Sequence, residues 1–133
     1  MRYLGLDLGT KTLGLSISQG IIATNLKTIR YDSKDKLIEQ LKNIISENNI
    51  DCLVLGFPKN MNNTIGPRAQ ETLEFKKELE SLGYKVELQD ERLSTVSALN
   101  CMIEADMSRK KRKEKVDTLA ATIILQTYLD RRI

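Results

Sequence analysis

Histidine and tryptophan are absent from this 133-residue sequence, and cysteine and proline each occur only twice. The lack of histidine excludes Ser-His-Asp and Cys-His catalysis, histidine general bases and histidine metal ligands. Any bound metal is therefore expected on oxygen ligands. Acid–base chemistry must use carboxylates, lysine, tyrosine, cysteine or water.

Long apolar segments are also lacking. No stretch reaches the roughly 18 residues that a membrane-spanning helix needs, and Asp7 stands where a signal peptide would be apolar. Cys52 and Cys101 lie far apart in apolar runs, which favours buried thiols in a reduced compartment and leaves a disulfide bond open as the alternative. The sequence predicts a soluble cytoplasmic protein with no membrane association.

The composition is that of one globular domain over residues 1–133. Apolar residues make up 41% and charged residues 29% of the chain. These fractions allow a sizeable core and exclude wholesale disorder. The net charge of +3 is too small to indicate a partner.

Alternating apolar residues predict β-strands in the first thirty positions. Every second residue is apolar in two segments, first at Leu4, Leu6 and Leu8 and then at Leu13, Leu15 and Ile17. The breaks at residues 9–11 and 19–20 suit tight turns between antiparallel strands. A third strand is expected at about residues 21–30.

Helical periodicity begins after Asp32 or Ser33, either of which offers an N-cap. The apolar face of this first helix comprises Leu37, Ile38, Leu41, Ile44 and Ile45. Asn48-Asn49 ends it, and the apolar run at residues 52–56 predicts a strand covered on both faces.

Glycine, asparagine and two prolines then predict a central loop at residues 56–66. A second helix is expected from Pro67 to a C-cap at Gly83. Val86 and Leu88 indicate a fifth strand, and Ser94 can cap a third helix. A last helix is expected with one face formed by Val116, Leu119, Ala120, Ile123, Ile124, Thr127 and Tyr128.

The resulting order is β-β-β-α-β-α-β-α-α. Strand–helix–strand crossovers place parallel strands side by side, and the initial meander adds two strands on the other side. The expected sheet order is 3-2-1-4-5, with strand 2 antiparallel to the others. This α/β arrangement is that of a ribonuclease H-like fold.

Acidic residues stand where these strands end. Asp7 ends the first strand, and Asp90 and Glu91 end the fifth, so parallel strands would bring them to one edge of the sheet. Asp117 follows Val116 in what we expect to be the first turn of the last helix. It either compensates the helix dipole or faces the sheet edge beside Asp7.

In the second case Asp7, Glu91 and Asp117 form a cluster of three carboxylates. Like charges at close range repel one another, and a divalent cation relieves that repulsion. Oxygen ligands select Mg²⁺ or Mn²⁺. Two such ions could activate water and stabilise the leaving oxygen of a phosphodiester, which requires no histidine.

A basic run precedes Asp117. Residues 109–115 hold six cations and one anion, so they carry +5 and the rest of the chain carries −2. Such runs are typical of solvated loops, but beside a phosphodiester-cleaving centre this one predicts phosphate binding by Arg109, Lys110, Lys111, Arg112, Lys113 and Lys115. Like-charge repulsion predicts that residues 106–115 are mobile without substrate. Only 5% of the residues are aromatic, so few side chains could stack on bases. This favours recognition of the backbone or the shape of a nucleic acid.

Two further cations lie near the predicted edge. Lys11 follows Gly9, where the backbone can approach a phosphate closely, and it either contacts substrate or is an exposed hairpin residue. Arg92 either orients Glu91 or binds phosphate, or forms a structural salt bridge. Ser94-Thr95 is interpreted as a helix cap rather than a nucleophile, because no base is available to activate it.

Four segments together resemble the YqgF family of Holliday junction resolvase-like proteins, which are also regarded as pre-16S rRNA nucleases. They are LDLGTKTLG at 6–14, GFP at 56–58, DERLST at 90–95 and KVDTLAA at 115–121. The resemblance implies a ribonuclease H-like fold, a metal-dependent nuclease site at Asp7, Glu91 and Asp117, and a role in ribosomal RNA maturation. Family members often have arginine where this chain has Thr12, and leucine where it has Phe57.

The leading hypothesis is a metal-dependent endonuclease acting on structured RNA, with pre-16S rRNA as substrate and ribosomal assembly factors as partners. The alternatives are cleavage of four-way DNA junctions, which would require a dimer rather than a monomer, and a non-catalytic RNA-binding assembly factor. The Asp-x-Gly-Thr opening also resembles a phosphate loop of actin-like ATPases and sugar kinases. Those proteins clamp ATP between two domains, and this chain supplies one.

Overall fold

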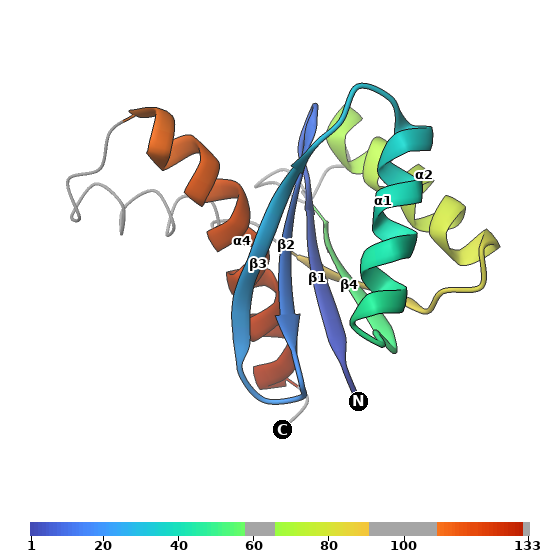
Figure 1. The fold of residues 1–133 in the computed structure, drawn as a ribbon, viewed down its shortest axis with the longest axis vertical. Coiled ribbons are helices and arrows are strands. Elements are labelled where there is room, and N and C mark those ends of the chain that lie inside the picture. The colour runs from blue at the N-terminus through green and yellow to red at the C-terminus, as the bar shows by residue number, and fades with distance from the viewer. Residues whose placement is uncertain (58–65, 91–108, 132–133) are drawn as a thin grey trace.

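The computed structural model describes residues 1–57, 66–90 and 109–131, and of residues 109–118 it describes the helical backbone alone. A five-stranded sheet has helices on both faces (Figure 1). The strands are β1 (Tyr3–Leu8), β2 (Thr12–Ser18), β3 (Ala23–Arg30), β4 (Cys52–Phe57) and β5 (Val86–Asp90). The helices within these ranges are α1 (Lys34–Glu47), α2 (Pro67–Ser81) and α4 (Arg109–Arg131).

The sheet has the order β3-β2-β1-β4-β5. β2 is antiparallel to β1 and β3, whereas β4 is parallel to both β1 and β5. The predicted order and the antiparallel second strand are therefore confirmed. Because β1, β4 and β5 run in one direction, their carboxyl ends lie at the same edge, which we call the carboxyl edge.

Local signals determine where α1 begins and ends. The Ser33 hydroxyl accepts a hydrogen bond from the Lys36 amide at 3.4 Å, which satisfies one of the unpaired donors of the first turn. At the other end the Asn48 amide donates to the Ile44 carbonyl, and Asn49 adopts a left-handed φ of 52°. The predicted caps are confirmed, and the predicted apolar face is buried except for the partly buried Ile38.

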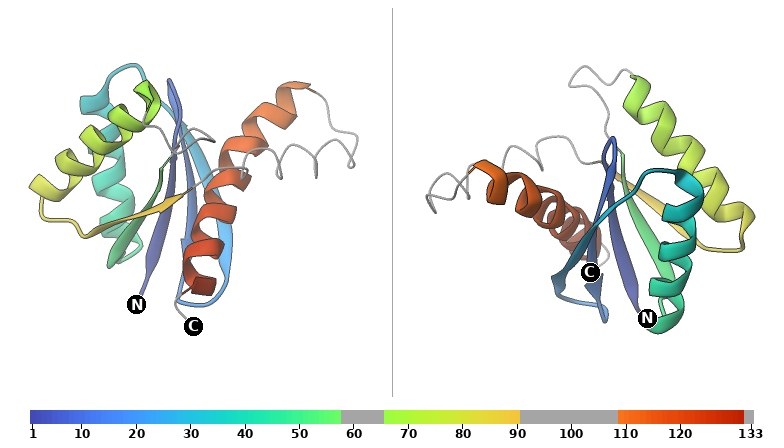
Figure 2. Two further views of the ribbon diagram at one scale, coloured as in Figure 1. Left: turned by 180° about the vertical axis from the view of Figure 1, so that it is seen from behind. Right: turned by 45° about the horizontal axis from the view of Figure 1, so that its top comes forward.

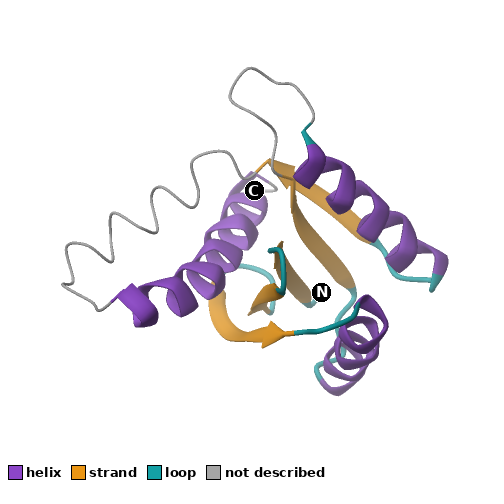
Figure 3. Ribbon diagram, turned by 90° about the horizontal axis from the view of Figure 1, so that it is seen from above, coloured by secondary structure: helices purple, strands orange, loops and turns teal. Residues whose placement is uncertain are grey.

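α2 follows the same logic. Pro67 occupies the start of the helix, where its missing amide proton costs nothing, and Gly83 follows the end with φ of 96°. Phe75 and Leu79 are fully buried against the sheet. Seen from above in Figure 3, α1 and α2 lie on one side of the sheet, where they enclose a core with the even-numbered leucines of β1.

α4 covers the opposite face and packs against all five strands. Its buried residues are Ala120, Ala121, Ile124, Leu125 and Leu129. The predicted face was partly wrong, because Thr127 is exposed and Ala121 and Leu125 lie at the centre of the contact. Residues 119–125 are almost all apolar, so their sequence does not determine which side of the helix meets the sheet.

The α4 backbone approaches β1 closely at Gly5. A Cβ atom at this position would lie 2.8 Å from Leu125 Cβ and 2.9 Å from the Ala121 carbonyl oxygen, and would also overlap Ser16 Oγ. The Ser16 hydroxyl donates to the same Ala121 carbonyl at 2.7 Å across this contact. A small residue on β1 and a buried hydroxyl on β2 thus set the position of α4 on the sheet.

The remaining expectations about the fold concern the start of β3, the cysteines, the third helix and the central loop. β3 begins at Ala23 rather than near residue 21, and Ile21 and Ile22 are exposed in the preceding turn. Cys52 is buried and in no disulfide bond, while Cys101, the helix capped by Ser94 and residues 58–65 of the central loop lie outside the described residues. No helix in the described ranges is long and apolar enough to cross a membrane.

Replacing Gly5 with alanine tests the α4 contact. The added methyl group meets three atoms below normal contact distance, so we expect Gly5→Ala to lower the free energy of unfolding by about 2 kcal/mol or more. Lys27→Ala, an exposed change on β3, should alter it by less than about 0.5 kcal/mol. Chemical denaturation measures both, and equal stability of the two variants would contradict the close approach.

Candidate functional site at the carboxyl edge

The strand register brings the predicted acidic positions to one edge. Asp7 is the penultimate residue of β1, and Phe57 ends β4 opposite Asp90 at the end of β5. The predicted common edge is confirmed for Asp7 and Asp90. Glu91 is the next residue in sequence after β5 and lies outside the described residues.

Asp7 is a nearly buried carboxylate, with 8% of its surface exposed. Side chains alternate along β1, so Leu6 and Leu8 join the core beneath α1 and α2, whereas Tyr3 packs with α4. Asp7 shares the α4 side with Tyr3 and Gly5. Its partner on the neighbouring strand β2 is Gly14, which contributes no side chain beside this carboxylate.

Contacts along α4 give its direction over the sheet. Ala121 packs against Gly5 of β1. The Thr122 hydroxyl donates to the Asn25 side chain, and further along the helix the Gln126 side chain bonds to the backbone of Ala23 and Ile21. Advancing along α4 therefore means moving backwards along β3. Because β3 and β1 run in the same direction, α4 is antiparallel to β1, as Figure 1 also shows.

This direction places Asp117 near the carboxyl edge. Asp117 precedes Ala121 by one helical turn, about 6 Å along the axis. Asp7 lies two residues beyond Gly5, about 7 Å along β1 in the same direction. Starting from the Gly5–Ala121 contact, the backbones of Asp7 and Asp117 thus lie a similar distance towards the carboxyl edge. Both are on the face of the sheet that α4 covers.

The predicted position of Asp117 within its helix was wrong. α4 begins at Arg109, so Asp117 lies about two turns inside the helix rather than in its first turn. Compensation of the helix dipole, which acts within the first turn, does not explain an acid here. The same finding corrects the expectation of a loop at residues 109–115, because these residues are helical. The segment predicted to be mobile also includes residues 106–108, which lie outside the described residues.

The turn after Asp7 is held by two residues that the sequence analysis missed. Arg68 donates from Nη2 to the Leu8 carbonyl at 3.1 Å, and the Tyr31 hydroxyl donates to the Gly9 carbonyl at 3.0 Å. Lys11 is exposed in this turn, while Arg92 lies outside the described residues. Arg68 carried one signal, because a cation in the first turn opposes the helix dipole.

The chemistry of the edge fits a divalent cation. Asp7 offers oxygen ligands of the kind Mg²⁺ and Mn²⁺ prefer, and it is nearly buried at the edge where β1, β4 and β5 end. No three potential ligand side chains gather within the described part of the chain, which contains Asp7 but neither Glu91 nor the Asp117 side chain. The three-carboxylate cluster therefore stays a prediction that the backbone arrangement favours.

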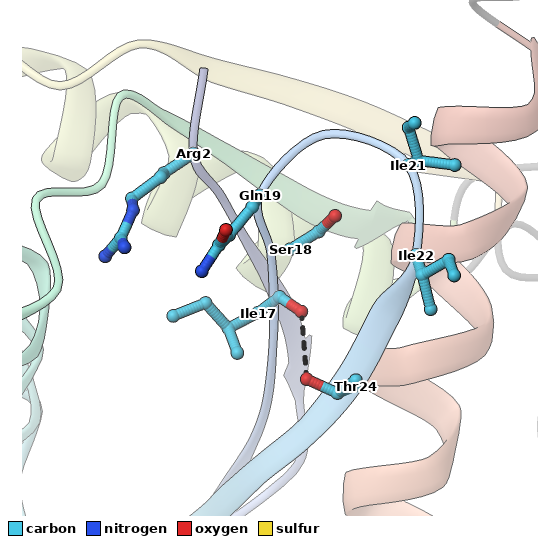
Figure 4. Close-up of a pocket in the computed structure, with 7 residues that line it drawn as sticks. All are labelled: Arg2, Ile17, Ser18, Gln19, Ile21, Ile22 and Thr24. Atoms are coloured by element: carbon cyan, nitrogen blue, oxygen red, sulfur yellow. Dashed lines mark hydrogen bonds between the residues drawn. The ribbon is translucent and has the colours of Figure 1, made fainter.

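A pocket of about 390 Å³ lies at the other end of the sheet (Figure 4). It is lined by Arg2, before β1, and by residues of the β2–β3 turn such as Ile21 and Ile22. Neither Asp7 nor Lys11, the predicted site residues whose side chains the structure describes, lines it. The pocket is therefore separate from the carboxyl edge.

Comparison with known proteins agrees with this arrangement. The RuvX family model, described as a Holliday junction resolvase, matches residues 1–131. A protein of Clostridium botulinum (strain Alaska E43 / Type E3) named "Putative pre-16S rRNA nuclease" is 52% identical over 134 residues, covering 98% of each chain. A protein of Geobacillus sp. (strain WCH70) with the same name is 51% identical over 135 residues, with the same coverage.

Two solved structures share the fold at low sequence identity. Thermus thermophilus RuvC in complex with a Holliday junction substrate superposes with a TM-score of 0.58 at 14% identity, covering 99% of this chain and 96% of the other. Fowlpox virus resolvase with Holliday junction DNA gives 0.59 at 12% identity, covering 100% and 99%. The predicted ribonuclease H-like fold is confirmed. The match over nearly the whole chain confirms the family that its four sequence segments resemble: the chain belongs to the RuvX (YqgF) family of nucleases.

Proposed function

We propose that this chain is a metal-dependent endonuclease that hydrolyses phosphodiester bonds in structured RNA and matures the 5′ end of pre-16S rRNA. One observation carries the proposal: a nearly buried carboxylate, Asp7, lies at the carboxyl edge of the sheet. The names of relatives about half identical over the full chain support the choice of substrate. A role in ribosome assembly would place the protein in the cytoplasm with ribosomal assembly factors as partners.

Asp7, Glu91 and Asp117 would together hold Mg²⁺ or Mn²⁺. Bound there, the metal would supply the activation of water and the stabilisation of the leaving oxygen. Asp7 is fixed by the central strand β1, and Asp117 by a helix whose position depends on the Gly5 contact. In this proposal the rigid sheet and α4 provide the geometry, and the carboxylates provide the charge.

Cations around the edge would bind the substrate backbone. The basic residues Arg109 to Lys115 occupy the first turns of α4, which extend beyond the sheet (Figure 2). Lys11 lies four positions after Asp7, in the turn between β1 and β2, and Arg92 follows Glu91 in sequence. Phosphate contacts of this kind give affinity without base readout, which agrees with the low aromatic content.

Cleavage of four-way DNA junctions is the second candidate, favoured by the description of the family model. A symmetric junction would need a homodimer that presents two sites. Sedimentation that shows only a monomer, with and without junction DNA, would count against it. Binding of RNA by the wild type without cleavage in either Mg²⁺ or Mn²⁺ would instead favour a non-catalytic assembly factor.

Asp7→Asn is the direct test of activity. It removes the carboxylate charge at nearly constant shape, so we expect cleavage of a labelled pre-16S rRNA fragment in Mg²⁺ or Mn²⁺ to fall at least about 100-fold. Asp32→Asn, the same change at an exposed position, should leave the rate unchanged. Wild-type rates in Asp7→Asn enzyme would refute the assignment, and four-way DNA assayed in parallel distinguishes the two substrates.

Metal binding should also be visible as stability. A ligand at about 100 times its Kd adds about 2.7 kcal/mol to the free energy of unfolding. We therefore expect Mn²⁺ to raise the Tm of the wild type and of Asp32→Asn, and to leave that of Asp7→Asn nearly unchanged. Equal shifts in all three proteins, measured by calorimetry against EDTA, would show that Asp7 holds no metal.

A further inference from the structure

The turn between β1 and β2 has all its carbonyl groups bound to the protein. Arg68 donates to the Leu8 carbonyl at 3.1 Å. The Tyr31 hydroxyl shares its single proton between the Gly9 carbonyl at 3.0 Å and the Thr10 carbonyl at 3.3 Å, and the Tyr31 amide donates to the Lys11 carbonyl at 3.1 Å. Two residues from distant parts of the sequence thus bind four consecutive carbonyl oxygens.

The Gly9 amide donates to the Thr12 carbonyl at 2.8 Å, whereas the other donors of the same turn are left exposed. Thr10 and Lys11 are both on the surface, and within the described ranges no group accepts a hydrogen bond from their amides, the Thr10 hydroxyl or the Lys11 ammonium. A turn whose acceptors face the protein and whose Thr10 and Lys11 donors face solvent is suited to an anion. This turn begins two residues after Asp7, at the carboxyl edge.

Tyr31 is built into this arrangement. It follows β3 directly and precedes the Ser33 cap of α1, so its backbone is fixed on both sides. Burial, and then the nearby Glu71 carboxylate, raise the pKa of the Tyr31 hydroxyl above its ordinary value of 10.0. The phenol therefore stays protonated, and keeps its proton to donate, throughout the neutral and mildly alkaline range.

We infer that Tyr31 and Arg68 are positioning residues that hold the Gly9–Thr10–Lys11 turn open as a cradle for a backbone phosphate of the substrate. This inference rests on the proposed function and adds to it a binding element formed before substrate arrives. Tyr31 contributes no charge to the cradle and acts through the turn. Without its hydroxyl, the Gly9 and Thr10 carbonyls would be free to rotate towards the bound phosphate and repel it.

The test measures binding of a structured RNA fragment in EDTA, where no cleavage occurs. We expect Tyr31→Phe to weaken binding about 5- to 10-fold, as loss of a hydroxyl that supports two contacts, and Lys11→Ala to weaken it by a similar factor. The double variant should bind little worse than either single variant, because both changes disable one cradle. Tyr84→Phe, which alters a half-buried tyrosine after α2, is the matched control and should bind like the wild type.

Salt dependence gives a readout that a purely structural role would not change. Removing one phosphate contact lowers the magnitude of the negative slope of log K against log salt by about 1. We expect this decrease in Lys11→Ala, and also in Tyr31→Phe although it removes no charge. Arg68→Ala, at an exposed position, gives a second route to the same result and should likewise be non-additive with Lys11→Ala.

The outcomes separate this inference from the proposed function. If the wild type cleaves RNA and Tyr31→Phe binds with unchanged affinity and slope, the cradle is refuted and the nuclease stands. Effects of Tyr31→Phe and Lys11→Ala that multiply would refute the cradle too, because the residues would then act independently. A wild type that neither binds nor cleaves nucleic acid would overturn both proposals.

Discussion

The close contact of α4 with Gly5 is the constraint on which the rest of the site depends. Only a residue without a side chain lets the Ala121 carbonyl approach β1, and the Ser16 hydroxyl then bonds to that carbonyl. This contact sets how closely α4 approaches the sheet, and the hydrogen bonds of Thr122 and Gln126 to β3 and the turn before it give the direction of the helix. Together these contacts carry Asp117 towards the edge where β1, β4 and β5 end. The packing of one helix is thus the physical link between the core and the proposed chemistry.

The carboxyl edge combines features that work against stability. Asp7 is nearly buried, and Arg68 opposes the dipole of its own helix. The proposed function would account for the first, with the carboxylate as a metal ligand, and the hydrogen bond from Arg68 to the Leu8 carbonyl accounts for the second, because it tethers the turn after β1. Unfavourable local choices that gather at one edge support a functional site there.

Much of this was predictable from sequence, for identifiable reasons. Ser33, Pro67 and Gly83 act locally, so helix boundaries could be placed, and the crossover rules then gave the sheet order. The face of α4 could not be predicted, because residues 119–125 are almost uniformly apolar. The start of α4 was missed although Ser108, a residue type favoured at helix N-caps, precedes Arg109 in the sequence. Tyr31 and Arg68 were missed because their partners are main-chain carbonyls 21 to 60 positions away, which no sequence pattern encodes.

The central claim is that carboxylates from β1, from the residue after β5 and from α4 converge on one cation. Anomalous diffraction from crystals soaked in Mn²⁺ tests it most directly. The account predicts an anomalous peak within about 2.2 Å of an Asp7 carboxylate oxygen, with Asp117 and Glu91 oxygens completing the ligands. The peak should vanish in Asp7→Asn crystals. Strong peaks elsewhere with none at Asp7, or side chains of Asp7 and Asp117 that point apart in the soaked crystal, would contradict it.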